Sequence, residues 1–166
     1  MGDVELYQFG DRDIRVIAPP GVFDFPVSAK RPFVFDGDPA VKGLESHLYV
    51  IEFGEHGIKV GYTADPMTRM IAHQRDGRHF SRHATCGWLS MAHVEAKDNE
   101  EALIGFCAEL TGIRVERRSE YSAAPFGRVQ EYAAALPMTR GDRQASEERS
   151  RRLVADFASM MFGGSL

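Results

Sequence analysis

The chain has 166 residues, of which 43% are hydrophobic and 27% are charged, and its net charge is −4 at neutral pH. This size and composition suit one ordinary globular domain with extensions, and they exclude a disordered chain, a coiled coil and a collagen-like repeat. The acidic balance also argues against nucleic-acid binding through bulk charge, so any contact with DNA must be local.

No apolar run approaches the roughly 20 residues that span a bilayer, and the N-terminus carries acidic residues where a signal peptide would carry basic ones. Two cysteines, Cys86 and Cys107, cannot build a disulfide framework. We therefore expect a cytoplasmic protein with reduced cysteines and no membrane contact.

Residues 1–46 predict a β-rich N-terminal extension. Short apolar runs at residues 4–9, 14–18 and 33–35 predict strands. The sequence Pro19-Pro20-Gly21 is expected to end the second of them.

Residues 47–125 predict the main domain, which begins with a β-hairpin. Two apolar and β-branched runs, at residues 47–53 and 58–63, are separated by Gly54-Glu55-His56-Gly57. Such a Gly-containing linker between two strand-like runs is typical of an antiparallel hairpin.

Two helices and a third strand follow the hairpin. Asp65 is a suitable N-cap, and Pro66 is tolerated as the first residue of a helix predicted over 66–76. Residues 89–96 predict the third strand, and a helix starting at Asp98 or Asn99 is expected to end at Gly112. The expected class is therefore α+β, with a small three-stranded antiparallel sheet flanked by helices.

Residues 126–166 predict a helical C-terminal extension, with helices over 126–136 and 146–161. Five apolar residues share one face of the last helix: Leu153, Val154, Phe157, Met160 and Met161. This face is expected to contact either the core or a second copy of the chain.

Five short segments of the main domain carry a resemblance to a known family. They are His47-Leu48-Tyr49, Lys59-Val60-Gly61-Tyr62-Thr63, Asp65-Pro66-Met67-Thr68-Arg69, Asn99-Glu100-Glu101-Ala102-Leu103 and Ser119-Glu120-Tyr121. Together they resemble the GIY-YIG nuclease superfamily, and within it the phage and bacterial subgroup whose second motif reads like KIGYT. The resemblance covers residues 47–122.

The resemblance implies a DNA endonuclease that hydrolyses a phosphodiester with one divalent metal, Mg²⁺ or Mn²⁺, and without an organic cofactor. By position, Tyr49 would help to activate the water nucleophile, and Arg69 would stabilise charge on the scissile phosphate. His73 lies where some members also have a histidine. Glu101 matches the single metal-binding glutamate, with Glu120 as the alternative.

These residue types also make chemical sense without a family. An arginine provides paired donors for phosphate oxygens, and Mg²⁺ can use a single protein carboxylate together with the substrate phosphate. Arg69 and His73, four residues apart on one helix face, can address one site. Arg75, Arg78 and Arg82 follow as a basic cluster for further phosphate contacts.

Two positions depart from the family pattern. His47 replaces the leading glycine of the first motif, and Lys59 replaces the second tyrosine. A hairpin loop of four residues would pair Tyr49 with Tyr62, whereas an odd-numbered loop or a bulge would bring Lys59 to the face of Tyr49. Tyr62 and Lys59 therefore both remain candidates for the second catalytic position.

The loss of the second tyrosine leaves two alternatives to the nuclease. One is a DNA-binding or regulatory module on the same fold, which uses Lys59, Arg69 and the basic cluster to hold phosphates without cutting. The other is a protein-interaction domain that does not bind nucleic acid. The acidic charge of the chain favours both alternatives over the enzyme.

Overall fold

A computed structural model of the chain describes residues 6–9, 12–17, 20–25, 33–115 and 121–162. Its centre is a four-stranded antiparallel sheet in the order β3-β7-β5-β6. These strands are β3 (Gly21–Asp24), β5 (Ser46–Glu52), β6 (Ile58–Thr63) and β7 (Cys86–His93). The α+β class is confirmed.

The expected count of three strands is wrong, because a strand from the N-terminal extension joins the sheet. This strand, β3, pairs with β7 and begins at Gly21, where the sequence was expected only to end a strand. The other three strands lie close to their predicted ranges, although the third covers Cys86–His93 rather than 89–96.

The rest of the N-terminal extension forms a second, smaller sheet. Its strands are β1 (Leu6–Phe9), β2 (Arg12–Ile17) and β4 (Phe33–Phe35). β2 pairs with β1 in antiparallel and with β4 in parallel orientation. Residues 4, 5 and 18 of the predicted strands lie outside the described residues.

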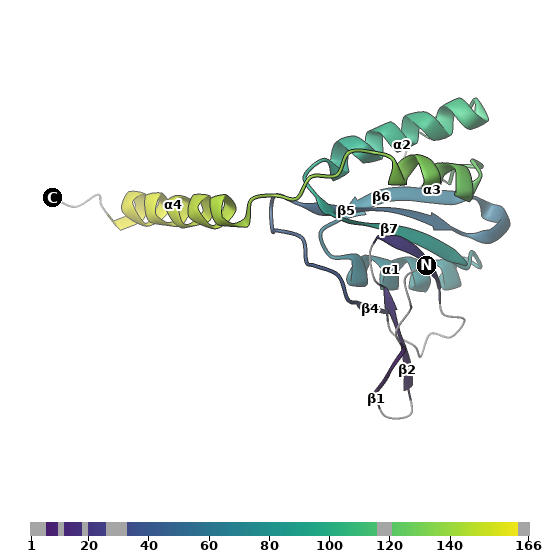
Figure 1. Cartoon of the computed structure of the whole chain (residues 1–166), viewed down its shortest axis with the longest axis horizontal. Helices are drawn as coiled ribbons and strands as arrows, with labels where there is room; N and C mark the ends of the chain where they lie inside the picture. Colours follow the sequence, from purple (N-terminus) through teal and green to yellow (C-terminus); the bar gives the residue numbers. More distant parts are fainter. Residues whose placement is uncertain (1–5, 10–11, 18–19, 26–32, 116–120, 163–166) are drawn as a thin grey trace.

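Four helices accompany the sheet: α1 (Pro66–His79), α2 (Ala96–Thr111), α3 (Phe126–Ala134) and α4 (Arg143–Phe162). Figure 1 shows α1 on one face of the sheet and α2 with α3 on the other. The predicted start of α1 is confirmed, because the Asp65 carboxylate accepts a hydrogen bond from the Thr68 backbone N–H at 3.0 Å. α2 ends as expected at Gly112, which has a φ of 71°.

The alternation of side chains along β5 divides the core into two layers. Leu48 and Val50 pack with Leu103 of α2 and its neighbours, whereas Tyr49 and Ile51 pack with Met70 of α1. All six except Tyr49 are completely buried, and Tyr49 is 6% exposed. β5 is therefore covered on both faces, and it holds Tyr49 rigidly beneath α1.

Helix α4 extends away from the rest of the molecule (Figure 1) and contains no buried residue. The five apolar side chains of its predicted face are between 63% and 80% exposed, so the expected contact with the core is wrong. Among the described residues, no helix is long and apolar enough to cross a membrane. Cys86 and Cys107 are both free thiols.

Candidate active site

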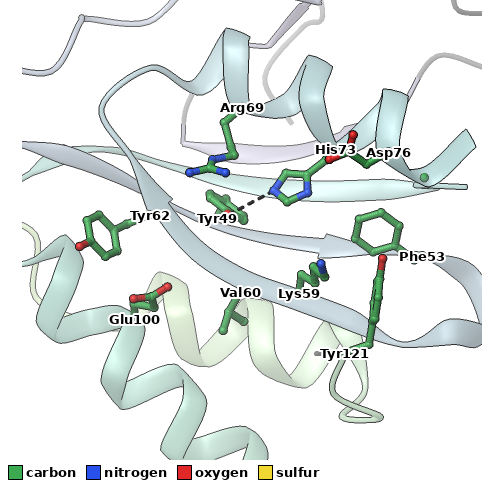
Figure 2. Close-up of a pocket in the computed structure, with 11 residues that line it drawn as sticks. Tyr49, Phe53, Lys59, Val60, Tyr62, Arg69, His73, Asp76, Glu100 and Tyr121 are labelled. Atoms are coloured by element: carbon green, nitrogen blue, oxygen red, sulfur yellow. Dashed lines mark hydrogen bonds between the residues drawn. The ribbon is translucent and has the colours of Figure 1, made fainter. Parts of the chain in front are cut away.

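A cavity of about 210 Å³ opens at the β6 edge of the main sheet. Figure 2 shows side chains from both faces of the sheet around it: α1 contributes from one side and α2 from the other. The lining residues are Tyr49, Phe53, Lys59, Val60, Tyr62, Arg69, His73, Asp76, Gly77, Glu100 and Tyr121. The five predicted catalytic residues, Tyr49, Lys59, Tyr62, Arg69 and His73, are therefore brought to one place, whereas the other four predicted site residues that the structure describes do not line the cavity.

The register of the β5–β6 hairpin decides which residue faces Tyr49. Glu52 pairs with Ile58, so the loop has five residues, and Tyr49 pairs with Gly61 rather than with Tyr62. Ile51 pairs with Lys59, which places Lys59 on the same face as Tyr49. The odd-numbered loop is thus the one that forms, and the register with Tyr49 opposite Tyr62 is wrong.

Gly61 is needed where Tyr49 crosses β6. A Cβ atom at position 61 would overlap the ring and hydroxyl of Tyr49. The absence of a side chain there lets the phenol lie across the strand and reach the cavity.

Helix α1 brings Arg69 and His73 over the cavity from one face, as their spacing predicts. His73 Nε2 lies 3.2 Å from the Tyr49 hydroxyl, a hydrogen bond drawn in Figure 2, and the two rings meet edge to face. Arg69 is exposed on the helix, and Figure 2 shows its guanidinium directed toward Tyr49 and His73.

The histidine of this pair is neutral at physiological pH. Burial is the main reason why the pKa of His73 falls from 6.5 to about 4, and the positive charges of Lys59 and Arg69 lower it further. A neutral imidazole has one unprotonated nitrogen. His73 can therefore accept a proton from the Tyr49 hydroxyl.

Lys59 is a half-buried cation on the floor of the cavity. Its Nζ lies 4.5 Å from the centroid of the Tyr121 ring, a cation–π distance. Burial, and after it the nearby charge of Arg82, lowers the pKa of Lys59 below its ordinary value. Lys59 thus faces the cavity from the same side as Tyr49.

The glutamate that lines the cavity is Glu100, not the predicted Glu101. Glu100 is 4% exposed and shares the inner face of α2 with Ala96, Leu103 and Cys107, whereas Glu101 is exposed and does not line the cavity. Positions 96, 100, 103 and 107 follow the spacing of a helix face. That periodicity was readable in the sequence and identifies Glu100.

The other predicted site residues divide into those at the cavity and those away from it. Tyr62 lines the cavity from the α2 side of β6, together with Val60. Arg75 is exposed and pairs with Asp76 at 3.4 Å, and Arg78 is exposed and hydrogen-bonds the Gln74 carbonyl. Arg82 approaches the Tyr121 ring instead. Glu120 lies outside the described residues.

Six residues that line the cavity were not predicted as site residues: Phe53, Val60, Asp76, Gly77, Glu100 and Tyr121. Tyr121 is brought in by a two-residue bridge between Ile58 and Ser122, whose backbone groups exchange hydrogen bonds of 2.8 and 2.9 Å. Such an isolated bridge between distant segments has no signal in sequence periodicity.

The described residues include no group of three or more His, Cys, Asp or Glu side chains that could enclose a metal. A single hard divalent ion such as Mg²⁺ does not need such a group, because it retains several waters and can share a substrate phosphate. The buried Glu100 carboxylate at the cavity supplies the one anionic oxygen ligand that this mode of binding requires. The donor set therefore fits a single Mg²⁺ or Mn²⁺.

No protein-family model, no curated protein and no solved structure matches this chain. The function is therefore inferred from the geometry of the cavity.

Proposed function

We propose that the chain is a divalent-metal-dependent DNA endonuclease of the GIY-YIG type, with its active site in the cavity at the β6 edge. The observation that carries the proposal is the 3.2 Å hydrogen bond between Tyr49 and a neutral His73, with Arg69 and Glu100 lining the same cavity. These four side chains combine a proton acceptor, a cation and an anionic oxygen ligand. Metal-dependent hydrolysis of a phosphodiester uses all three.

In this mechanism the Tyr49 hydroxyl takes a proton from the attacking water while it passes its own proton to His73 Nε2. The water oxygen forms a bond to phosphorus, the bond from phosphorus to the leaving oxygen breaks, and that oxygen takes a proton from solvent, to which His73 afterwards releases the proton that it accepted. Arg69 holds two oxygens of the phosphate and offsets the charge that develops on them. Glu100 would hold Mg²⁺ or Mn²⁺, which supplies Lewis-acid stabilisation of the phosphate when it is bound.

A second candidate function, DNA binding without cleavage, is favoured by one specific feature. Lys59 occupies the place of the motif's second tyrosine, and a lysine holds phosphate as a point charge. Among the described residues, neither Lys59 nor Arg69 forms an ion pair with a carboxylate. Both cations therefore remain available for phosphate in either function.

The expected cellular setting follows the proposed substrate. A nuclease or DNA-binding module would act in the cytoplasm, and the exposed apolar face of α4 is the predicted contact with a second copy of the chain. Both statements remain predictions.

Two adjacent glutamates provide a matched test of the enzyme. Glu100→Gln preserves size but removes the charge at the cavity, so Mn²⁺-dependent cleavage of plasmid and branched DNA should fall on the order of 100-fold or more. Glu101→Gln makes the same change on the exposed side of α2 and should leave cleavage unchanged. Both variants should bind DNA in EDTA as the wild type does.

Alternatively, the wild type cleaves no duplex, branched or single-stranded DNA with Mg²⁺ or Mn²⁺ but binds DNA with a steep salt dependence. That result would contradict the enzyme and support the DNA-binding module. Protein that neither cleaves nor binds DNA would support the protein-interaction domain.

A further inference from the structure

The ring of Tyr121 holds two cations that come from different parts of the chain. Lys59 Nζ lies 4.5 Å and the Arg82 guanidinium carbon 5.0 Å from the ring centroid. Lys59 belongs to β6, whereas Arg82 follows the end of α1. Cation–π contacts of this kind attract each cation to the face of the ring.

The local backbone fixes the Tyr121 ring beside the β5–β6 hairpin. Ile58 and Ser122 exchange backbone hydrogen bonds, and Gly57 allows the close approach because a Cβ there would overlap the Ser122 carbonyl. The Tyr121 ring also meets Phe53 edge to face, with centroids 5.0 Å apart and planes at 88°. Its position is therefore set by the sheet edge and does not depend on the two cations.

The loop after α1 is folded so that Arg82 reaches this ring. The Arg82 backbone N–H donates to the Gly77 carbonyl at 2.6 Å, which turns the chain back over the end of α1. Ser81, directly before it, has a φ of 56°, and it is the only residue other than glycine with a positive φ among those described. Left-handed backbone at a non-glycine residue is costly and is often found at functional sites.

The two cations that contact this ring repel each other. After burial, the charge of Arg82 is the next cause that lowers the pKa of Lys59, and the charge of Asp76 acts in the opposite direction. Among the described residues, no carboxylate forms an ion pair with either of them. An anion that contacts both cations would offset this repulsion.

We infer that Lys59 and Arg82, held by Tyr121, form a second phosphate subsite that binds the phosphate next to the scissile one on the same DNA strand. The inference rests on the proposed function, because Lys59 and Tyr121 line the same cavity as Arg69. Arg82 donates its guanidinium fork to the phosphate oxygens, Lys59 contributes a point charge, and Tyr121 is a positioning residue. Arg75 pairs with Asp76 and Arg78 hydrogen-bonds the Gln74 carbonyl, so neither is assigned to this subsite.

The subsite is tested with nucleotides that carry one or two phosphates. Binding of thymidine 5′-monophosphate and thymidine 3′,5′-bisphosphate to the full chain is measured by calorimetry in EDTA. The bisphosphate should bind at least tenfold more tightly, the scale of one charge-assisted contact. Arg82→Ala should abolish this preference, whereas Arg78→Ala, an exposed arginine of the same region, should keep it.

The positioning role of Tyr121 needs its own variants. Tyr121→Leu should abolish the preference for the bisphosphate, and Tyr121→Phe, which keeps the aromatic face, should restore it. Tyr132→Leu, at a ring stacked on Phe106 in another part of the fold, is the control for loss of an aromatic side chain and should have no effect. If Tyr121→Leu fails to fold, the comparison of Arg82→Ala with Arg78→Ala still decides the question.

Equal binding of the two nucleotides, or equal losses in Arg82→Ala and Arg78→Ala, would overturn the subsite. These measurements use no metal, so they are independent of cleavage. Cleavage without a preference for the bisphosphate would leave the nuclease intact and remove the subsite. If the protein does not cleave DNA but prefers the bisphosphate, and Arg82→Ala abolishes that preference, the subsite is supported and the nuclease is contradicted.

Discussion

Two groups of polar side chains flank β5, and they differ in where their partners come from. Just before the strand, the buried Glu45 carboxylate accepts hydrogen bonds from the Val41 and Gly141 backbone N–H groups and from Arg140. Every one of these partners belongs to the chain itself. We call Glu45, Arg140, Val41 and Gly141 the Glu45 cluster.

The cavity presents the opposite situation. Lys59, Arg69 and Arg82 are at or beside it, and none of them forms an ion pair among the residues that the structure describes. A buried charge with internal partners serves the stability of the fold, whereas cations left without an anion are suited to bind one. The Glu45 cluster should therefore control folding, and the cavity cations should control binding.

The largest effect is expected from the Glu45 cluster. Glu45→Gln should lower the free energy of unfolding at neutral pH by about 2–3 kcal/mol, because two buried backbone donors and the Arg140 charge lose their anionic partner. Chemical denaturation measures this loss, and DNA binding should be unchanged. Glu147→Gln, in an exposed pair with Arg151, is the control and should change stability by less than about 0.5 kcal/mol.

The same cluster predicts a dependence on pH. Burial of Glu45 would raise its pKa, but the hydrogen bonds from Val41, Arg140 and Gly141 outweigh burial and hold the pKa below its usual value of 4.5. The stabilisation is therefore present above pH 4.5 and is lost as the pH falls through the lowered pKa. A wild type and a Glu45→Gln variant with parallel stability profiles below pH 5 would show that this carboxylate does not titrate as argued.

The second effect concerns the cavity cation closest to the proposed chemistry. Arg69→Ala should reduce cleavage on the order of 100-fold, because a phosphate-binding guanidinium acts in the transition state. The melting temperature should stay within about two degrees, since exposed substitutions usually change stability by under 0.5 kcal/mol. Arg75→Ala, exposed on the same helix, should retain activity. A fall of many degrees in Arg69→Ala would instead mean that Arg69 is structural.

Local signals in the sequence were sufficient for most boundaries of the elements that build the site, although α2 begins at Ala96 and not at the predicted Asp98 or Asn99. The Asp65-Pro66 start of α1, the Gly112 end of α2 and the two strands of the hairpin are all set by residues that act on their immediate neighbours. The i and i+4 spacing also places Arg69 and His73 together. This part of the cavity could therefore be predicted.

Pairings between distant segments could not be predicted in the same way. β3 is only four residues long and gains its partner more than 60 positions later, in β7. Tyr121 reaches Lys59 through a bridge to Ile58, and the hairpin register depended on whether the loop had four or five residues. None of these pairings leaves a periodic pattern within a short window.

The choice between Glu100 and Glu101, unlike the pairings of distant segments, could have been made correctly from the sequence. The family motif favoured Glu101, whereas the spacing of Ala96, Leu103 and Cys107 along one helix face favours Glu100. Side-chain periodicity placed the residue, and motif position did not.

The third effect is a pH dependence that comes from the cavity. The pKa of His73 is lowered from 6.5 to about 4, mainly by burial. At a pH between these two values, His73 therefore binds a proton in the unfolded chain but not in the folded chain. Stability should consequently fall by about 1 kcal/mol between pH 7 and pH 5.5 through this group. Urea denaturation of His73→Gln should show a smaller loss over that interval. An equal loss in both proteins would contradict a neutral His73.

The smallest effect is expected outside both groups, in α4. A chain that ends at Asp142 keeps Arg140 and Gly141 but lacks the whole helix, none of whose residues is buried. Its melting temperature at low protein concentration should lie within about two degrees of the full chain, and cleavage should be unchanged, since the helix contributes no side chain to the lining of the cavity.

The same truncation tests the predicted contact between two copies. Leu153, Phe157 and Met160 lie on the exposed apolar face of α4, and burying such side chains is the usual driving force for association. Light scattering should find the full chain as a dimer and the truncated chain as a monomer. A full chain that is still monomeric at a concentration on the order of 100 μM would contradict the contact. A dissociation constant above that concentration is weaker than that of a stable homodimer. If the truncated chain remains dimeric, the interface must lie on the sheet or its flanking helices. The second copy would then have to be tested for a contribution to the cavity beside its cations.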